Sequence, residues 1–248
     1  MHLREKRVLI TGGAIRIGRA ISETLAAAGC HLAIQYRNAE TEALDLANQF
    51  AKCDVNVTTI QADLMNMCEV EALVPEAAQR LGGLDILINN AAVFHKTSLL
   101  GSSPDVLQAD LAVNALAPIQ LMRCFAQLQR ETSPQAWPEA SIVNLLDRRV
   151  AGIEKGALPY ALSKNMLRDA TQIAALELGP QIAVNAVAPG PILPPPGKGV
   201  DYLNDQAGPM VLAQRPTPVD IANAVRFLLE ADGITGQVIF VDSGQHLL

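Results

Sequence analysis

Tyr160 and Lys164 stand four positions apart in the segment LPYALSK, and both side chains can exchange a proton. Pro159 is well placed to open a helix there, and side chains at i and i+4 share one helical face. A close ammonium favours the phenolate and so lowers the pKa of a phenol, commonly by about 1–3 units. The pair predicts a tyrosine that exchanges a proton with a substrate, assisted by the lysine. The same spacing occurs by chance on many exposed helices, so its meaning depends on the rest of the chain.

A glycine-rich turn near the N-terminus is the second candidate site. The segment TGGAIRIG follows a strand-like run and precedes a helical one, although the strict G-x-G-x-x-G spacing is absent. A strand, such a turn and a helix N-terminus together present backbone N–H groups to a pyrophosphate, and this is the first turn of its kind in the chain. The alternative is a tight turn at Gly12-Gly13 with no ligand. The residues expected to contact a dinucleotide here are Thr11, Gly12, Arg16, Ile17 and Gly18.

The end of the second predicted strand bears on the choice of cofactor. The sequence there is QYRN, residues 35–38, with no acid before Glu40. A protein that selects NAD usually places an acid at this point, whereas an arginine can meet a 2′-phosphate with its fork of donors. Arg37 therefore favours NADPH; the alternative is a solvated arginine. Asp63 either accepts hydrogen bonds from an adenine or caps a turn. The residues expected at this end of the cofactor are Tyr36, Arg37, Asn38 and Asp63.

The chain alternates between short β-branched runs and longer segments of helical period, which predicts a parallel sheet covered on both faces. Several runs carry consecutive apolar residues, as strands buried on both faces do. We expect a doubly wound α/β fold with about seven strands, and 248 residues suit a single domain spanning 1–248. The predicted strands are 8–11, 31–36, 55–61, 84–89, 141–145, 182–187 and 237–241.

Two helices and one long loop are also predicted. Apolar residues at helical spacing indicate a helix over 17–28 that Gly29 terminates. Thr217, Pro218 and Asp220 form the start signal of a helix that should run to about residue 231. Between them, 190–217 contains six prolines, among them Pro194, Pro195 and Pro196, and little periodicity. A structureless loop of this length indicates a functional segment over a site or a disordered one.

Composition excludes several classes of function. Half of the residues are hydrophobic and 18% are charged, so a large core is expected. The formal charge of −6 argues against a nucleic-acid surface, and we expect no run that reaches the length of a membrane span. The N-terminus shows no signal region. The four scattered cysteines suit neither a metal site nor a disulfide framework, so we expect a cytoplasmic protein without a metal.

Taken together, these features resemble the short-chain dehydrogenase/reductase family over essentially the whole chain. In that family the tyrosine donates a proton, and the lysine binds the nicotinamide ribose and lowers the tyrosine pKa. The resemblance further implies that Asn114 steadies a water in the proton relay, that NADPH is the cofactor, and that the protein is a homotetramer. The matching pieces are Thr11-Gly12 to Gly18, Asp63, Asn89-Asn90-Ala91, Asn114, Tyr160, Lys164, Pro189-Gly190, Thr235-Gly236 and Val241-Asp242. The cofactor contacts implied by resemblance include Asn90, Ala91, Lys164, Pro189 and Gly190.

The sequence departs from the common family pattern at two positions, and at both it resembles the pteridine reductase subgroup. Arg16 replaces the middle glycine of the turn, and Asp147 replaces the serine at the end of the strand before the tyrosine. Local similarity extends to Tyr36-Arg37, to residues 90–94 and to residues 114–118. In that subgroup a pterin lies between the nicotinamide and the phenylalanine that matches Phe94. The substrate contacts implied are Arg16, Phe94, Asp147 and Tyr160.

The chemistry fits these residue types. Reduction of a ring C=N bond needs a hydride at carbon and a proton at nitrogen, and an aspartate beside a tyrosine can relay that proton. Three simpler roles stay open: an ion pair of Asp147 with Arg148 or Arg149, a surface position for Arg16, and a core position for Phe94. The expected function is NADPH-dependent reduction of a pterin. The alternatives are a carbonyl reductase of the same family and a nucleotide-sensing protein without turnover, since fold does not fix function.

Overall fold

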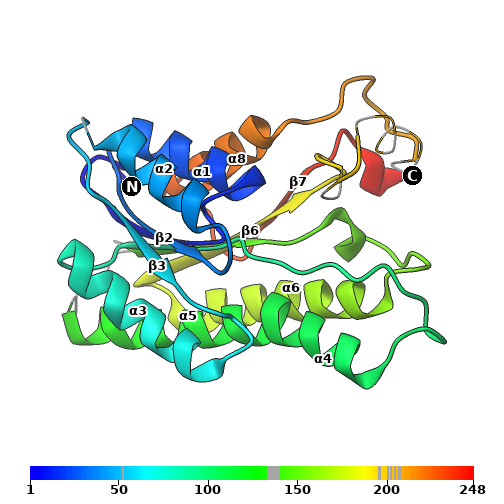
Figure 1. Cartoon of the computed structure of the whole chain (residues 1–248), viewed down its shortest axis with the longest axis horizontal. Coiled ribbons are helices and arrows are strands. Elements are labelled where there is room, and N and C mark those ends of the chain that lie inside the picture. The colour runs from blue at the N-terminus through cyan, green and yellow to red at the C-terminus, as the bar shows by residue number, and fades with distance from the viewer. Residues whose placement is uncertain are drawn as a thin grey trace.

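Seven parallel strands form one sheet in the order β3-β2-β1-β4-β5-β6-β7 (Figure 1). The structure is a computed structural model that describes residues 1–51, 53–132, 140–194, 197–199, 201, 203, 205 and 208–248. All seven predicted strands are confirmed, and their ends differ from the prediction by two residues or fewer. Their bounds are β1 Arg7–Thr11, β2 His31–Tyr36, β3 Val57–Gln61, β4 Ile86–Asn89, β5 Ala140–Leu145, β6 Ile182–Pro189 and β7 Val238–Val241.

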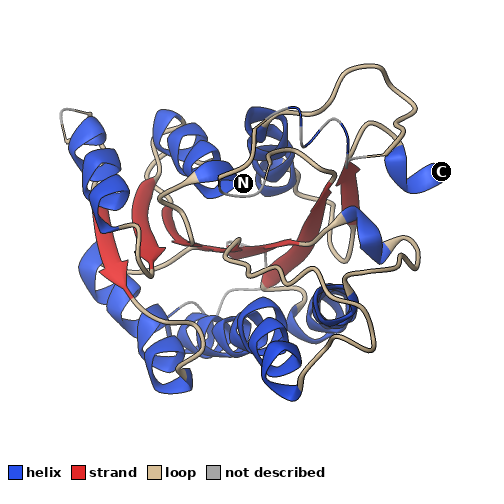
Figure 2. Ribbon diagram, turned by 45° about the vertical axis from the view of Figure 1, so that its right-hand side comes forward, coloured by secondary structure: helices blue, strands red, loops and turns tan. Residues whose placement is uncertain are grey.

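Helices cover both faces of the sheet, as the alternating pattern predicts (Figures 1 and 2). One face carries α1 (Arg16–Ala27), α2 (Glu40–Phe50) and α8 (Pro218–Glu230). The other carries α3 (Met67–Leu81), α4 (Pro104–Leu111), α5 (Ala117–Thr132) and α6 (Leu158–Leu178). Short irregular helices follow three elements: the π-helix η1 (Ala112–Leu116), and the 3₁₀ helices η2 (Arg148–Val150) and η3 (Gln245–Leu247).

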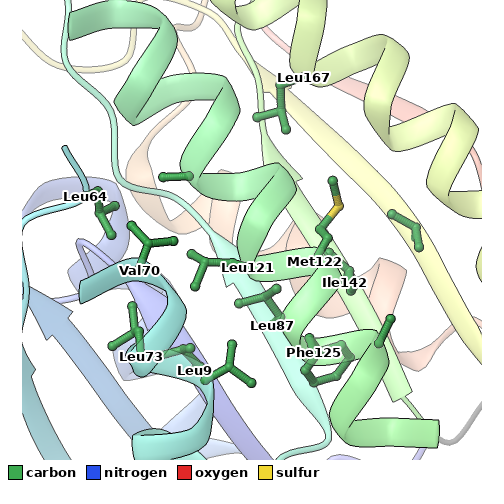
Figure 3. Close-up of a cluster of buried hydrophobic side chains, with 14 of the residues drawn as sticks. Leu9, Leu64, Val70, Leu73, Leu87, Leu121, Met122, Phe125, Ile142 and Leu167 are labelled. Carbon is green, nitrogen blue, oxygen red and sulfur yellow. The ribbon is translucent and has the colours of Figure 1, made fainter. Parts of the chain in front are cut away.

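The core lies between the sheet and these helices in two layers. Strand β4 is buried along its whole length, as expected of a strand covered on both faces. Figure 3 shows the layer under α3 and α5, where Leu73 and Phe125 pack towards Leu9, Leu87 and Ile142 of the strands. This continuous apolar contact fixes the strand ends relative to α6, the helix that carries Tyr160 and Lys164.

The strand order reverses its direction of growth between β1 and β4, because β1 pairs with β2 on one side and with β4 on the other. In a doubly wound sheet the crevice outside the carboxyl ends of such strands is where ligands bind. The glycine-rich turn follows β1 and Asn90 follows β4, so both reach this crevice. The topology therefore brings the predicted nucleotide residues to one place.

The predicted helix signals hold in detail. Helix α1 runs one residue earlier than predicted, and Gly29 beyond its end has a φ of +88°. At α8 the Thr217 side chain accepts from the Asp220 N–H, and the Asp220 carboxylate accepts from the Thr217 N–H at 2.7 Å. This reciprocal pair is a capping box. Of the predicted loop over 190–217, residues 195, 196, 200, 202, 204, 206 and 207 lie outside the described residues.

The helical stretch 104–132, formed by α4, η1 and α5, is long and apolar enough to cross a membrane by length and composition alone. Its most apolar window has a mean hydropathy of 1.2, so the expectation that no run reaches this length was wrong. Half of that window is buried inside the protein, as in a core helix of a globular domain. Packing against the sheet therefore accounts for its apolar character.

Candidate active site

A cavity of about 600 Å³ opens at the carboxyl ends of β1 and β4. It runs from Arg37 and Asn38 at one end to Tyr160 at the other, and it is lined midway by the glycine-rich turn. The predicted residues that line it are Gly12, Arg16, Ile17, Gly18, Tyr36, Arg37, Asn38, Asp63, Asn90, Ala91 and Tyr160. Several predicted residues are not among those that line it: Thr11, Phe94, Asn114, Asp147, Lys164, Pro189 and Gly190.

Thr11 and Asn90 shape the cavity from behind. The Thr11 hydroxyl accepts from the backbone N–H groups of Asn90 at 2.9 Å and Ala91 at 3.1 Å. In return the Asn90 amide donates to the carbonyls of Thr11 at 2.9 Å and Gly12 at 3.0 Å. These neutral bonds tie the turn after β1 to the segment after β4, so the two residues hold the turn in shape.

Gln35 is a residue of this site that the sequence reasoning missed. Its amide oxygen accepts from the Gly12 N–H at 2.9 Å, and its amide nitrogen donates to the Ala62 carbonyl at 2.7 Å. The side chain is buried and so connects the glycine-rich turn to the segment that carries Asp63. The available signal was a single amide directly after the apolar run LAI of the second strand.

The glycines of the turn are required by close approach. A Cβ added to Gly18 would lie 2.0 Å from the Gly12 carbonyl oxygen, and Gly12 itself has a φ of +60°. Arg16 also has a positive φ of +56°, a strained value for a side-chain-bearing residue. Its guanidinium donates to the Pro194 carbonyl at 2.9 Å, and partial burial lowers its pKa. Arg16 thus links the nucleotide turn to the long loop.

The far end of the cavity carries Arg37 and Asn38, both exposed. Nearby, Asp63 accepts from the Met65 N–H at 3.0 Å, which is the turn-capping role that the sequence left open. The Asp63 residue also lines the cavity, so the second possibility, an adenine contact, stays a prediction.

Asp147 and Tyr160 meet at the opposite end. The Tyr160 hydroxyl donates to Asp147 Oδ2 at 3.3 Å. Asp147 also caps η2 by accepting from the Arg149 N–H at 2.9 Å, and its carboxylate pairs with the Arg149 guanidinium at 3.2 Å. Arg148 pairs with Glu154 instead. The ion pair that the sequence left open therefore forms with Arg149, and it coexists with the contact to Tyr160.

The pKa of Tyr160 departs from the expectation that Lys164 lowers it. Burial raises this pKa well above its usual value, and the Asp147 carboxylate raises it further. The Lys164 ammonium lies 5.8 Å from the Tyr160 ring centroid, and it donates to the Leu145 carbonyl at 2.6 Å. The positive charge that lowers the Tyr160 pKa is the Arg149 guanidinium, and burial and the Asp147 carboxylate outweigh it. Tyr160 is therefore a neutral phenol at pH 7, which is the form that donates a proton.

Lys164 is held in a buried position by the geometry of α6. Tyr160, Ser163, Lys164 and Leu167 form one helical stripe that faces the sheet, as the i, i+4 spacing predicts. Burial lowers the pKa of Lys164 to about 8, against the opposing effect of the Asp147 and Asp110 carboxylates. The lysine is thus charged at neutral pH but close to losing its proton.

Asn114 lies in the π-helix η1, a rare element that is frequent at functional sites. Its amide oxygen accepts from the Val93 N–H at 2.9 Å. Its amide nitrogen donates to the Val93 carbonyl at 2.9 Å and to the Ser163 hydroxyl at 3.0 Å. These contacts show a side chain that holds the segment before Phe94 against α6. The implied role in steadying a water stays a prediction.

Phe94 is 45% exposed, which rules out the core position left open from the sequence. Its ring meets the Tyr160 ring edge-to-face, with centroids 4.7 Å apart, and the Arg149 guanidinium lies 5.7 Å from its centroid. Arg149, like Gln35, was not among the predicted site residues, although an ion pair between Arg149 and Asp147 was left open from the sequence.

Pro189 and Gly190 end β6 beside β7. The Gly190 N–H donates to the Val241 carbonyl at 3.1 Å, and a Cβ at Gly190 would lie 2.8 Å from the Asp242 Cβ. The structure therefore requires glycine there for close packing of the two strand ends. Contact of these two residues with a cofactor stays a prediction.

Comparison with known proteins identifies the family of this chain. The family described as enoyl-(acyl carrier protein) reductase matches residues 13–246. Pteridine reductase 1 of Leishmania tarentolae is 33% identical over 96% of each chain, and the 3-oxoacyl-acyl-carrier-protein reductase FabG of Staphylococcus aureus is 32% identical over 98% of each. FolM alternative dihydrofolate reductase 1 from Brucella canis, solved in complex with NADP, has a TM-score of 0.90 at 33% identity, covering 100% of this chain and 97% of that one. The chain belongs to the short-chain dehydrogenase/reductase family of oxidoreductases.

Proposed function

We propose that this protein is an NADPH-dependent reductase that delivers hydride to a pterin-type substrate, of the dihydropterin or dihydrofolate class. The observation that carries the proposal is the contact between the Tyr160 hydroxyl and the Asp147 carboxylate at 3.3 Å, with the half-exposed Phe94 ring against Tyr160. A serine in place of Asp147 would suit a carbonyl oxygen. A carboxyl group adds a proton carrier suited to a ring nitrogen.

The cavity fits a dinucleotide. Its glycine turn leaves no room for a Cβ at Gly18, so backbone can approach a pyrophosphate there. At the far end of the cavity, the end of the second strand carries Arg37 and lacks the acid that would favour NAD. The Arg37 guanidinium would bind a 2′-phosphate. The Brucella canis relative is described as complexed with NADP, which supports the same choice. When bound, NADPH supplies the hydride.

The protein's own residues supply the proton. Tyr160, whose pKa burial and Asp147 raise, is a neutral phenol and donates its phenolic proton to the ring nitrogen as the hydride reaches the adjacent carbon. The C=N bond becomes CH–NH, and the resulting phenolate recovers a proton from solvent through the Asp147 carboxyl group. Lys164 and Arg149 are positive charges near the phenolate, so they limit the cost of forming it. The half-exposed Phe94 ring suits contact with a flat heteroaromatic ring.

A carbonyl reductase is the rival, because the FabG relative is about as similar as the pteridine reductase. One assay distinguishes the two functions: NADPH oxidation measured with 7,8-dihydrobiopterin, dihydrofolate and acetoacetyl coenzyme A. The proposal predicts turnover of at least one of the first two at a higher kcat/KM than the ketone. Turnover of the ketone alone would assign the protein to the carbonyl reductases. No NADPH oxidation with any of the three would favour a nucleotide-sensing role.

The expected homotetramer is part of the proposal. Helix α6 leaves an apolar stripe on its outer side: Leu162, Met166, Ile173 and Leu176 are 50%, 41%, 55% and 85% exposed. A stripe of this kind on an enzyme helix favours burial against another copy. Light scattering should give about four times the 26.4 kDa of one chain. A particle of 26.4 kDa would contradict it.

A further inference from the structure

A buried carboxylate lies beside the site and makes no hydrogen bond to Tyr160 or Lys164 within the described part of the chain. Asp110, in the last turn of α4, is fully buried, and its Oδ1 lies 2.8 Å from Nδ1 of His95. Within the described part of the chain, its Oδ2 has no hydrogen-bond partner. Burying a carboxylate is costly unless it is paired, so a helix position filled by aspartate rather than an apolar residue calls for a specific reason.

The partner of Asp110 supplies that reason, because His95 directly follows Phe94. On the other side of Phe94, both backbone groups of Val93 are held by Asn114 at 2.9 Å. Asp110 and Asn114 are four positions apart on the continuous helical stretch of α4 and η1. One stretch of helix therefore holds the chain immediately before and immediately after Phe94.

Phe94 needs such support because its ring is 45% exposed. Among the described residues, its aromatic and cationic contacts are Tyr160 and Arg149, both part of the site. Packing in a core would set the direction of a phenylalanine ring, but a half-exposed ring depends on its backbone. We infer that Asp110 and His95 are positioning residues: their pair, with Asn114, holds the Phe94 ring in its edge-to-face contact with Tyr160, where it borders the substrate.

The pair is distinct from the proton-transfer residues. The Nδ1 atom of His95 is occupied by Asp110, and the carboxylate that contacts the Tyr160 hydroxyl belongs to Asp147. In this inference His95 acts through its neighbour Phe94. The inference rests on the proposed function only in treating Phe94 as a substrate contact; the geometric part, that the pair holds the ring, stands apart from it.

A measurement that needs no substrate tests the geometric part. The chain contains three tyrosines, so ¹³C labelling of tyrosine rings gives few NMR signals, and Tyr160→Phe assigns the one from Tyr160. The Phe94 ring current shifts that signal, and Phe94→Ala gives its position without the ring. His95→Ala and Asp110→Ala should move the Tyr160 signal towards the Phe94→Ala position. Asp110→Asn keeps an oxygen acceptor for Nδ1–H and should move it less.

His31→Ala is the matched control. His31 also uses Nδ1 in a hydrogen bond, with the Asn56 N–H at 2.8 Å, but it begins β2 and so lies at the amino end of that strand, away from the carboxyl ends where the site lies. Its removal should leave the Tyr160 signal in place. His95 is substantially exposed, so His95→Ala carries the test even where Asp110→Ala fails to fold. A Tyr160 signal at the wild-type position in folded His95→Ala would overturn the inference.

Kinetics test the functional part through a double-mutant cycle of Phe94→Ala and His95→Ala. With 7,8-dihydrobiopterin as substrate, His95→Ala alone should raise KM about tenfold, and it should add almost nothing in the Phe94→Ala background, since the two residues act as one unit. The KM for NADPH should stay unchanged. Additive effects would show that His95 acts independently of Phe94. A wild-type enzyme inert towards both 7,8-dihydrobiopterin and dihydrofolate would refute the proposed function, while the NMR result would still decide the positioning role.

Discussion

The two ends of the cavity differ in the interactions that hold them. At the nucleotide end, the turn after β1 is held by neutral hydrogen bonds from Thr11, Gln35 and Asn90, and close contacts leave room only for glycine at 18. At the chemical end, Asp147 and Lys164 are ionisable and partly or fully buried, and the Asp147 carboxylate opposes the lowering of the Lys164 pKa by burial. The nucleotide end is thus defined by shape and the chemical end by charge. Substitutions that change size should damage the first, and substitutions that change charge or proton content should damage the second.

The largest effect is expected from Tyr160→Phe, which preserves size and removes the proton. Turnover should fall by about 10²–10⁴-fold, the scale for loss of a positioned acid. NADPH affinity should be unchanged, because the ring remains in the cavity wall. Stopped-flow kinetics and fluorescence titration of NADPH measure the two quantities. Near-normal turnover would show that the proton comes from elsewhere.

Lys164→Met tests the charge at the chemical end through stability. The folded-state pKa of Lys164 is about 8, against 10.5 for the free side chain. Between these pH values the unfolded chain holds a proton that the folded chain has lost, so wild-type stability should rise relative to Lys164→Met as pH rises from 8 to 10.5. The gain is at most about 3 kcal/mol in the free energy of unfolding. Urea titrations of both proteins across this range measure it, and parallel pH profiles would contradict the lowered pKa.

Gly18→Ala tests shape at the nucleotide end with one methyl group and no change of charge. The added Cβ would lie 2.0 Å from the Gly12 carbonyl oxygen, so the turn must shift. We expect the Kd for NADPH to rise by about 100-fold, the scale for a displacement of roughly 1 Å at a site. Gly233→Ala is the matched control, since no heavy atom lies within 4 Å of its added Cβ. Equal Kd values for the two variants would show that the turn does not contact the cofactor.

Arg37→Ala sharpens the comparison, because it is the one place where charge is expected to matter at the nucleotide end. The exposed guanidinium should contribute modestly, so KM for NADPH should rise roughly tenfold. The KM for NADH, which lacks the 2′-phosphate, should hardly change. Steady-state kinetics with both cofactors decide the matter. Equal losses with both would mean that Arg37 supports the local fold.

Much of the nucleotide end was predictable because its signals are local. A glycine turn after a strand and an arginine at the next strand end are contiguous in sequence, and the topology then brings them together. Gln35 was missed because its partners, Gly12 and Ala62, are 23 and 27 residues away. A buried amide within an apolar strand indicates a polar partner but does not say which one.

The chemical end was predictable only in part. The i, i+4 spacing of Tyr160 and Lys164 fixed their shared face, since helical geometry alone determines it. The direction in which the pKa of Tyr160 shifts could not be predicted, because it depends on burial and on which charge approaches the hydroxyl. The pairing of His95 with Asp110 likewise depends on the path of a segment with no regular structure between β4 and α4.

Asp147→Ser gives the most direct test of the claim that Asp147 makes this a pterin reductase. Serine can still cap η2, and Arg149 keeps its pairing with Glu154 at 3.0 Å, so the fold should survive. Turnover of 7,8-dihydrobiopterin should fall by about 10²-fold or more, while turnover of acetoacetyl coenzyme A is retained or improved. A variant that melts like the wild type and reduces the dihydropterin at the wild-type rate would contradict the account, because Asp147 would then be a capping residue without a part in proton transfer.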